Sequence, residues 1–185
     1  LEAAASFWLE MGVDGFRLDA VKEYVSGSTS SNIEILSWFN QYVLSVNPDA
    51  YLVGEAWETN PVTLSAYYKS GVASFFDFPL AQATGSIATM VNRGTGAKLA
   101  SLLTQSETIY GAIDPSFIDA PFLSNHDTSR ISAHYVNDLS KMKLAAGILL
   151  TMNGTPFVYY GEEIGMNSKG TKDENKRLPM HWSDT

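Results

Sequence analysis

The sequence predicts an α/β fold with a parallel sheet, and the order of its elements carries that prediction. Apolar, β-compatible runs at 13–19 and 51–57 each include a carboxylate near the carboxyl end and are each followed by a helical stretch. Strand, helix, strand, helix is the order typical of parallel sheets, because a crossover must connect successive parallel strands. Further strands are predicted at 74–78, 120–127 and 156–161.

The predicted helices follow from hydrophobic spacing. Residues 1–11 place apolar side chains three and four positions apart. Asn32 is the predicted N-cap of a helix that ends at Asn47. The other predicted helical stretches are 61–70, the segments on either side of 92–94, and 139–152. From Glu162 onward a mostly polar loop is expected.

Composition excludes several classes of function. Twelve Lys and Arg against twenty Asp and Glu give a formal net charge of −8, which argues against nucleic acid or an anionic membrane as a partner. The absence of cysteine excludes disulfides, thiolate metal sites and a cysteine nucleophile. No apolar run reaches the roughly 18 residues of a membrane span. A neutral or cationic substrate fits this composition best.

The chain has 185 residues, fewer than the roughly 250 of a complete α/β barrel. It begins at Leu1 rather than at a methionine, so it is expected to come from the middle of a longer protein, with any signal peptide upstream. We favour an extracellular over a cytoplasmic location, although cysteine usage leaves the compartment open.

Arg17 and Asp19 stand at the end of the first predicted strand. The two-residue period of a strand places both side chains on one face, where the guanidinium can hold Asp19 ionised and oriented. An ionised, oriented Asp is a candidate nucleophile. The alternative is a structural Arg–Asp pair at a strand end.

Three predicted strands end in Asp19, in Glu55 and in the pair His126-Asp127. In parallel α/β folds, functional residues gather at the carboxyl ends of strands. Three carboxylates in one cavity repel one another, so one is expected to stay protonated and serve as a general acid, with Arg17 and His126 as counter-charges. A nucleophilic Asp beside a carboxylic acid is typical of retaining glycosidases, whose two carboxyl groups lie about 5 to 5.5 Å apart. The alternative is three unrelated carboxylates on separate loops.

These motifs resemble the α-amylase family of glycoside hydrolases. Three segments are similar to signature regions of that family, in the family's order: Gly15-Phe16-Arg17-Leu18-Asp19, Gly54-Glu55-Ala56-Trp57 and Phe122-Leu123-Ser124-Asn125-His126-Asp127. Segments 74–79 and 154–165 resemble the sixth and eighth barrel strands. The resemblance implies that residues 1–185 form the C-terminal half of a catalytic (β/α)8 TIM barrel, about strands 4 to 8 with their helices, whose N-terminal half is missing.

The resemblance also implies roles for individual residues. Asp19 would be the nucleophile, Glu55 the general acid/base and Asp127 the stabiliser of the transition state. The substrate-binding residues would be Arg17, His126, Lys22 and Trp57. A solvated side chain is the alternative for Lys22, and a packing role is the alternative for Trp57.

The implied activity is hydrolysis of α-1,4-glucans such as starch and maltodextrin, through a glycosyl-enzyme intermediate. Ala20 after the nucleophile resembles the members that act on α-1,4 rather than α-1,6 links. A glucanotransferase of the same family is one alternative, and a non-catalytic glucan-binding or interaction protein on the same fold is another. The expected partner is an α-glucan oligosaccharide or polysaccharide, with no nucleic acid and no membrane span.

The family's first signature region, which supplies an Asn for calcium, has no match in this chain. Glu23 also stands where many α-amylases have a His whose carbonyl binds calcium. No metal ligand is therefore assigned here, and calcium is an expectation for the full-length parent. A five-strand arc would expose two sheet edges and an apolar interior. The isolated 185 residues are thus expected to self-associate and to be inactive.

Overall fold

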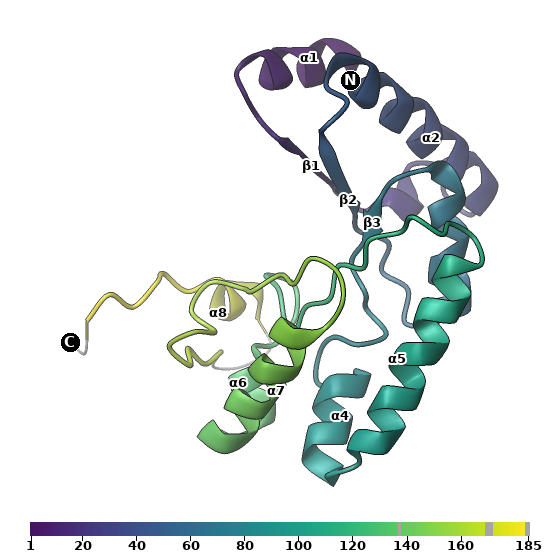
Figure 1. Ribbon diagram of the computed structural model, residues 1–185. Helices are drawn as coiled ribbons and strands as arrows, with labels where there is room; N and C mark the ends of the chain where they lie inside the picture. The colour runs from purple at the N-terminus through teal and green to yellow at the C-terminus, as the bar shows by residue number, and fades with distance from the viewer. Residues whose placement is uncertain (137, 169–171, 184–185) are drawn as a thin grey trace. The chain divides into compact units, whose positions relative to one another are not determined.

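A computed structural model describes residues 1–136, 138–168 and 172–183 of the chain. They form two compact units (Figure 1). Unit 1 comprises Leu1–Phe76 and Ser106–Asp119, and unit 2 comprises Asp77–Gln105 and Ala120–Thr185.

Unit 1 is built on a parallel sheet with the strand order β1-β2-β3. Its elements before residue 77 are α1 (Glu2–Glu10), β1 (Gly15–Leu18), the 3-10 helix η1 (Val21–Glu23), α2 (Thr29–Val46), β2 (Tyr51–Gly54), α3 (Pro61–Ser65), the 3-10 helix η2 (Ala66–Ser70) and β3 (Ser74–Phe75). The predicted helices at 1–11 and 61–70 are present in these bounds. The parallel pairing of the first three strands is confirmed as well.

Strand β3 is shorter than the predicted strand at 74–78. It ends at Phe75. The amide of the next residue, Phe76, still donates a hydrogen bond to the carbonyl of Gly54 at 3.1 Å. Beyond it the chain turns, because the carbonyl of Asp77 accepts from the amide of Leu80 at 3.1 Å. The amide of Asp77 donates to the carbonyl of Ala120 at 3.1 Å, so the backbone bonds a later segment of the chain before it turns.

Two glycines allow the strands of unit 1 to approach closely. A Cβ atom built on Gly15 would lie 1.8 Å from the carbonyl oxygen of Tyr51, and one built on Gly54 would lie 2.5 Å from the ring of Phe75. Neither neighbour can yield far, since one is backbone of the paired strand and the other is a fully buried aromatic ring. These positions therefore require glycine for steric reasons.

The prediction that Asn32 caps α2 is wrong. The N-cap is Ser28, four residues earlier, and its hydroxyl accepts from the amide of Ser31 at 3.3 Å. Asn32 is instead buried inside the first turn. Its side-chain oxygen accepts from the amide of Val25 at 2.6 Å, and its amide donates to the carbonyl of Lys22 at 2.6 Å. Asn32 thus ties α2 to the loop that follows η1.

Replacing Asn32 with alanine should lower the free energy of unfolding by about 2 to 3 kcal/mol, because the amide of Val25 and the carbonyl of Lys22 would lose their partner in a buried position. Urea denaturation of the polypeptide that carries this sequence measures the change. Gln41→Ala on the exposed side of the same helix is the matched control, expected within about 0.5 kcal/mol of wild type. Equal stability of Asn32→Ala and wild type would contradict the role of Asn32 in tying α2 to the loop that follows η1.

Unit 2 is mainly helical in the part that the structure describes. Its helices are α4 (Ser86–Arg93), α6 (Ile131–His134), α7 (Leu139–Thr151) and α8 (Asp173–Lys176), and it shares α5 (Gly96–Gly111) with unit 1. The predicted helices around 92–94 and over 139–152 are confirmed. Helix α8 lies within the stretch predicted to be polar loop, of which residues 169–171 and 184–185 fall outside the described residues.

Of the predicted strands at 120–127 and 156–161 only bridge residues remain, at Ala120, Phe122 and Phe157, and Phe122 and Phe157 form a parallel bridge with each other. The amide of Phe157 donates to the carbonyl of Pro121 at 2.9 Å. Each bridging phenylalanine follows a proline, and a proline has no N–H to donate to a ladder. The pairing direction is therefore as predicted, but the regular strands are not formed.

Helices long and apolar enough to cross a membrane are absent from residues 1–136, 138–168 and 172–183.

Candidate active site

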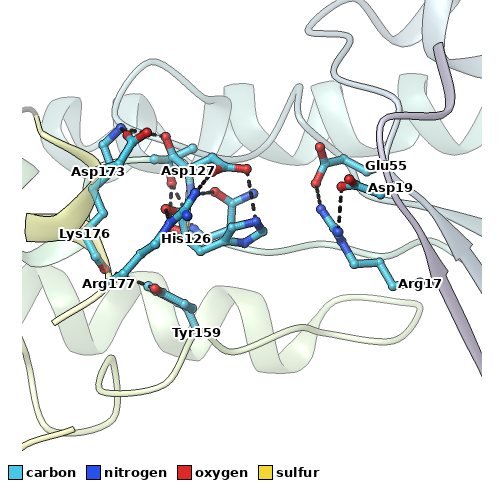
Figure 2. A network of polar contacts seen from close by, with 11 residues as sticks. Arg17, Asp19, Glu55, His126, Asp127, Tyr159, Asp173, Lys176 and Arg177 are labelled. Carbon is cyan, nitrogen blue, oxygen red and sulfur yellow. Dashed lines mark hydrogen bonds and ion pairs between the residues drawn. The ribbon is translucent and has the colours of Figure 1, made fainter. Parts of the chain in front are cut away.

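One guanidinium in unit 1 holds two of the three predicted catalytic carboxylates. Arg17 Nη1 donates to Asp19 Oδ1 at 2.8 Å, and Arg17 Nη2 donates to Glu55 Oε2 (Figure 2). The side chain of Asp19 is 77% exposed, whereas that of Glu55 is only 8% exposed. The sequence-based expectation that Arg17 and Asp19 share one face of the strand is confirmed, and Glu55 joins them.

The backbone of two neighbouring strands places these side chains. The last pair of the β1–β2 register is Leu18 with Gly54, so Asp19 and Glu55 both follow directly after paired residues. The amide of Glu55 donates to the carbonyl of Leu18 at 2.8 Å. Both carboxylates thus leave the sheet at the carboxyl end, where parallel strands converge.

A sharp turn follows Asp19 at once. Ala20 has a φ of 43°, in the left-handed region that residues with a Cβ atom seldom adopt. The amide of Val21 then donates to the carbonyl of Glu55 at 2.9 Å. The chain therefore ends β1 abruptly, and Asp19 projects from the strand end with most of its side chain exposed to solvent.

The two neighbouring carboxylates together outweigh burial in their effect on the pKa of Arg17. Burial by itself would lower the pKa of the guanidinium, but the negative charges and hydrogen bonds of Glu55 and Asp19 outweigh it and raise the pKa. Arg17 stays protonated at any pH of interest. Its planar fork can therefore orient both carboxylates at the same time.

Lys22 is paired rather than freely solvated. Its Nζ lies 2.8 Å from Glu58 Oε1 and donates to the carbonyl of Trp57 at 3.2 Å. The hydrogen bond to Glu58 raises the pKa of Lys22, so the ammonium stays charged. Trp57 itself is 38% exposed. Lys22 and Trp57, both predicted to bind substrate, are thus brought together within unit 1.

The third predicted catalytic carboxylate, Asp127, lies in unit 2 with both of its oxygens engaged. Asp127 Oδ1 accepts from Arg177 Nη2 at 2.5 Å, and Asp127 Oδ2 lies 3.1 Å from His126 Nε2 (Figure 2). The carbonyl of Asp127 accepts from Lys176 Nζ at 3.0 Å. The amide of Asp127 donates to the side-chain oxygen of Asn125 at 3.0 Å. Asp127 is therefore fixed through both backbone and side chain.

Sequence reasoning missed Arg177 and Lys176. They stand about 50 positions after Asp127, at the end of α8 in a stretch predicted to be loop, and no local spacing links them to the His126-Asp127 motif. The hydroxyl of Tyr159 also donates to the carbonyl of Lys176 at 3.0 Å. These contacts hold the α8 segment against the loop that carries Asp127.

The family model described as "Alpha amylase, catalytic domain" matches residues 1–185, which is the whole chain. The chain belongs to this family. The fold of α-amylase catalytic domains is a TIM barrel, and the parallel sheet of unit 1 is a part of such an α/β fold.

Individual relatives agree with the family match. Alpha-amylase 3 of Dictyoglomus thermophilum is 42% identical over 182 residues, which are 97% of this chain and 35% of that protein. A cyclomaltodextrin glucanotransferase of a Bacillus species (strain 38-2) is 32% identical over 100% of this chain and 25% of its own length. Eubacterium rectale Amy13B has a solved structure that superposes with a TM-score of 0.94 at 40% identity, covering 100% of this chain and 37% of that one. This α-amylase-family chain thus spans between a quarter and just over a third of the length of these relatives.

Glu162, in the segment that resembles the eighth barrel strand of α-amylases, is a further carboxyl group of unit 2 that sequence reasoning did not single out. Burial raises its pKa to about 7, although the hydrogen bonds from Ser124 and from the amide of Tyr159 and the charge of Arg130 act in the opposite direction. The Ser124 hydroxyl donates to Glu162 Oε1, and the amide of Tyr159 donates to Glu162 Oε2 at 3.2 Å.

The raised pKa of Glu162 makes stability depend on pH. Between pH 4.5, the ordinary pKa of a glutamate, and about pH 7, the folded protein holds a proton on Glu162 that the unfolded chain has lost. The stabilisation by this bound proton is therefore complete below pH 4.5 and is lost as the pH rises to about 7. Glu162→Gln cannot ionise and should not show this loss. We expect the variant to gain about 1 to 3 kcal/mol over wild type at pH 8 relative to pH 5. Thermal melts at both pH values measure the difference, and an equal shift at both would contradict it.

A metal site is not evident in the part of the chain that the structure describes, where no group of three or more His, Asp or Glu side chains could hold an ion.

Proposed function

We propose that the chain is the C-terminal half of the catalytic barrel of a retaining glycoside hydrolase that acts on α-1,4-glucans. The single observation that carries the proposal is the contact of one guanidinium, that of Arg17, with both Asp19 and Glu55. Two carboxyl groups bonded to one arginine fork lie close together, in keeping with the separation of about 5 to 5.5 Å that retaining enzymes use. Family membership supports the same reading.

In the proposed mechanism Asp19 attacks the anomeric carbon while Glu55 donates its proton to the glycosidic oxygen. The bond from the anomeric carbon to Asp19 forms as the bond to the leaving sugar breaks. The ionised Glu55 then takes a proton from water, which attacks the same carbon and releases Asp19. The configuration at the anomeric carbon is inverted twice and so retained.

Asp127 is the proposed transition-state stabiliser, because an oriented carboxylate can bind sugar hydroxyls more tightly as the ring flattens. His126 would assist it from the same loop. Lys22 and Trp57 would bind a neighbouring sugar, the indole through its exposed face and the ammonium through hydroxyl groups. The salt bridge of Lys22 to Glu58 favours this role over a solvated one, since it holds the side chain in one position.

We further propose that the described elements correspond to strands 4 to 8 of the barrel and that a longer polypeptide supplies the rest. The chain covers 25 to 37% of the length of the relatives named above, which supports this assignment. An extracellular location, where polymeric glucan is available, suits the proposed substrate.

The isolated chain should self-associate. Strand β1 has a neighbour on one side only within the described sheet, and Phe7 and Trp8 on α1 are more than half exposed. An unpaired strand edge with apolar surface nearby favours contact with a second copy. Light scattering on the 185-residue chain should therefore give a mass above the monomer's 20.2 kDa. A stable, monodisperse monomer would contradict this prediction.

The decisive experiment follows the anomeric configuration of the product. The full-length enzyme is incubated with maltoheptaose, and proton NMR records the first reducing sugar released. The proposal predicts an α-anomer that converts to the β-anomer only by slow mutarotation. Initial release of the β-anomer would exclude a retaining mechanism, and an unchanged substrate would exclude the activity itself.

The second candidate function is transfer to a sugar hydroxyl instead of water. It is favoured by the 32% identity over the whole chain to a cyclomaltodextrin glucanotransferase. Chromatography of the maltoheptaose products separates the two functions, because a transferase forms oligomers longer than the substrate or cyclic products, whereas a hydrolase forms only shorter ones.

A further inference from the structure

The loop that carries Asp127 is anchored on both sides by one short segment of unit 2, Tyr159–Glu162. Before the loop, the hydroxyl of Ser124 donates to the carboxylate of Glu162. After the loop, Arg130 Nη1 donates to the carbonyl of Tyr160 at 2.5 Å. The two anchor points on the loop are six positions apart and their partners are two positions apart.

Both loop anchors are buried. The residue exposures are 2% for Ser124 and 0% for Arg130. The guanidinium of Arg130 also stacks on the rings of Tyr159 and Tyr160, 4.4 and 4.7 Å from their centroids. A buried hydrogen bond cannot be replaced by bulk water, so the loss of either anchor would change the position of the loop.

The carboxylate of Glu162 is itself oriented by the backbone. Its Oε2 accepts from the amide of Tyr159 at 3.2 Å, which directs Oε1 toward Ser124. The side chain of Glu162 thus bridges the backbone of its own segment and the start of the loop.

Hydrogen bonds inside the loop connect this anchor to Asp127. Asn125, directly after Ser124, donates its amide to Thr128 Oγ1 at 2.9 Å. Its side-chain oxygen accepts from the amide of Asp127 at 3.0 Å. A shift of Ser124 would therefore displace Asn125 and, through it, the backbone of Asp127.

We propose that Glu162 is a positioning residue for Asp127, acting through its hydrogen bond with Ser124. The inference rests on the proposed function, in which Asp127 stabilises the transition state. Hydrogen bonding rather than charge carries the role, because a glutamine can accept from the Tyr159 amide through its oxygen and donate to the Ser124 hydroxyl through its nitrogen. Methionine at position 162 has a similar length and can do neither.

The test compares Glu162→Met and Glu162→Gln in the full-length enzyme. Glu162→Met should lower kcat on maltoheptaose by about tenfold with KM changed less than about twofold, since ground-state binding of the remaining sugars persists. Glu162→Gln should restore kcat. Glu174→Met is the control, since Glu174 lies on α8 with its side chain 72% exposed, and its kcat should equal that of wild type.

Hydrogen exchange of single amides tests the inference without reference to activity. In Glu162→Met the amides of Asn125 and Asp127 should exchange at least about tenfold faster than in wild type, while the buried sheet of unit 1 keeps its protection. Ser124→Ala should reproduce this pattern, and combining it with Glu162→Met should add little, as expected for two partners of one bond.

Each outcome decides between the alternatives. Unchanged exchange in Glu162→Met, or a Glu162→Gln variant as impaired as Glu162→Met, would overturn the positioning role. Additive effects of Ser124→Ala and Glu162→Met on amide exchange would also overturn the positioning role. A wild-type enzyme that leaves maltoheptaose intact would contradict the proposed function alone, because the exchange experiment still shows whether Glu162 orders the loop.

Discussion

Asp19→Asn should abolish turnover of maltoheptaose almost completely, with kcat falling by about 10⁴-fold. An amide is a poor nucleophile, so the covalent intermediate cannot form. The fold should be preserved, because the side chain is 77% exposed and asparagine is isosteric with aspartate. Substrate binding should change little, since the contact that Asp19 makes in the structure is with Arg17 rather than with a buried partner.

The measurement is kcat and KM of the purified full-length enzyme, wild type beside variant. Asp14→Asn is a suitable control, because Asp14 also lies close to strand β1 but at its opposite end, ahead of Gly15. Its kcat should remain within about twofold of wild type. Retention of more than a few per cent of wild-type kcat in Asp19→Asn would rule out Asp19 as nucleophile.

Arg17→Lys should lower kcat by about 10²-fold although the positive charge is kept. A lysine ammonium is a single point donor on a flexible stem and cannot hold two carboxylates in fixed directions. Asp19 and Glu55 would then each be misplaced, and small displacements of reacting groups are costly. Glu55 would suffer most, because its side chain is only 8% exposed and water cannot fully replace the guanidinium.

Steady-state kinetics of Arg17→Lys are compared with those of Arg93→Lys. Arg93 is exposed in the last turn of α4, and its replacement should leave kcat and KM unchanged. The change in Arg17→Lys should appear in kcat more than in KM, because the fork orients reacting groups rather than binding remote sugars. Wild-type kcat in this variant would show that bidentate orientation by Arg17 is unnecessary.

The Arg17–Asp19 contact could be predicted because it depends on local geometry. Two residues at a strand end with a spacing of two share a face, whatever the rest of the chain does. The place of Glu55 beside them followed from the same logic, since parallel strands bring their carboxyl ends together. The spatial relation of Asp127 to this pair stays a prediction.

Other features depend on competition or on distant residues and could not be predicted. Both Ser28 and Asn32 are good N-cap residues, and only the packed structure shows that Ser28 caps the helix while Asn32 is drawn inside by Val25 and Lys22. The contact of Arg177 with Asp127 joins residues 50 positions apart. Side-chain pairing over such a separation leaves no trace in hydrophobic periodicity.

The shared guanidinium of Arg17 has a consequence for the two halves of the proposed reaction. Before the ester forms, the fork contacts both the attacking group, Asp19, and the acid/base group, Glu55. Once Asp19 has become an ester it carries no charge, and of the two described partners Glu55 alone is left as an ion-pair partner of Arg17. One fixed cation thus orients the nucleophile in the first half and the group that activates water in the second.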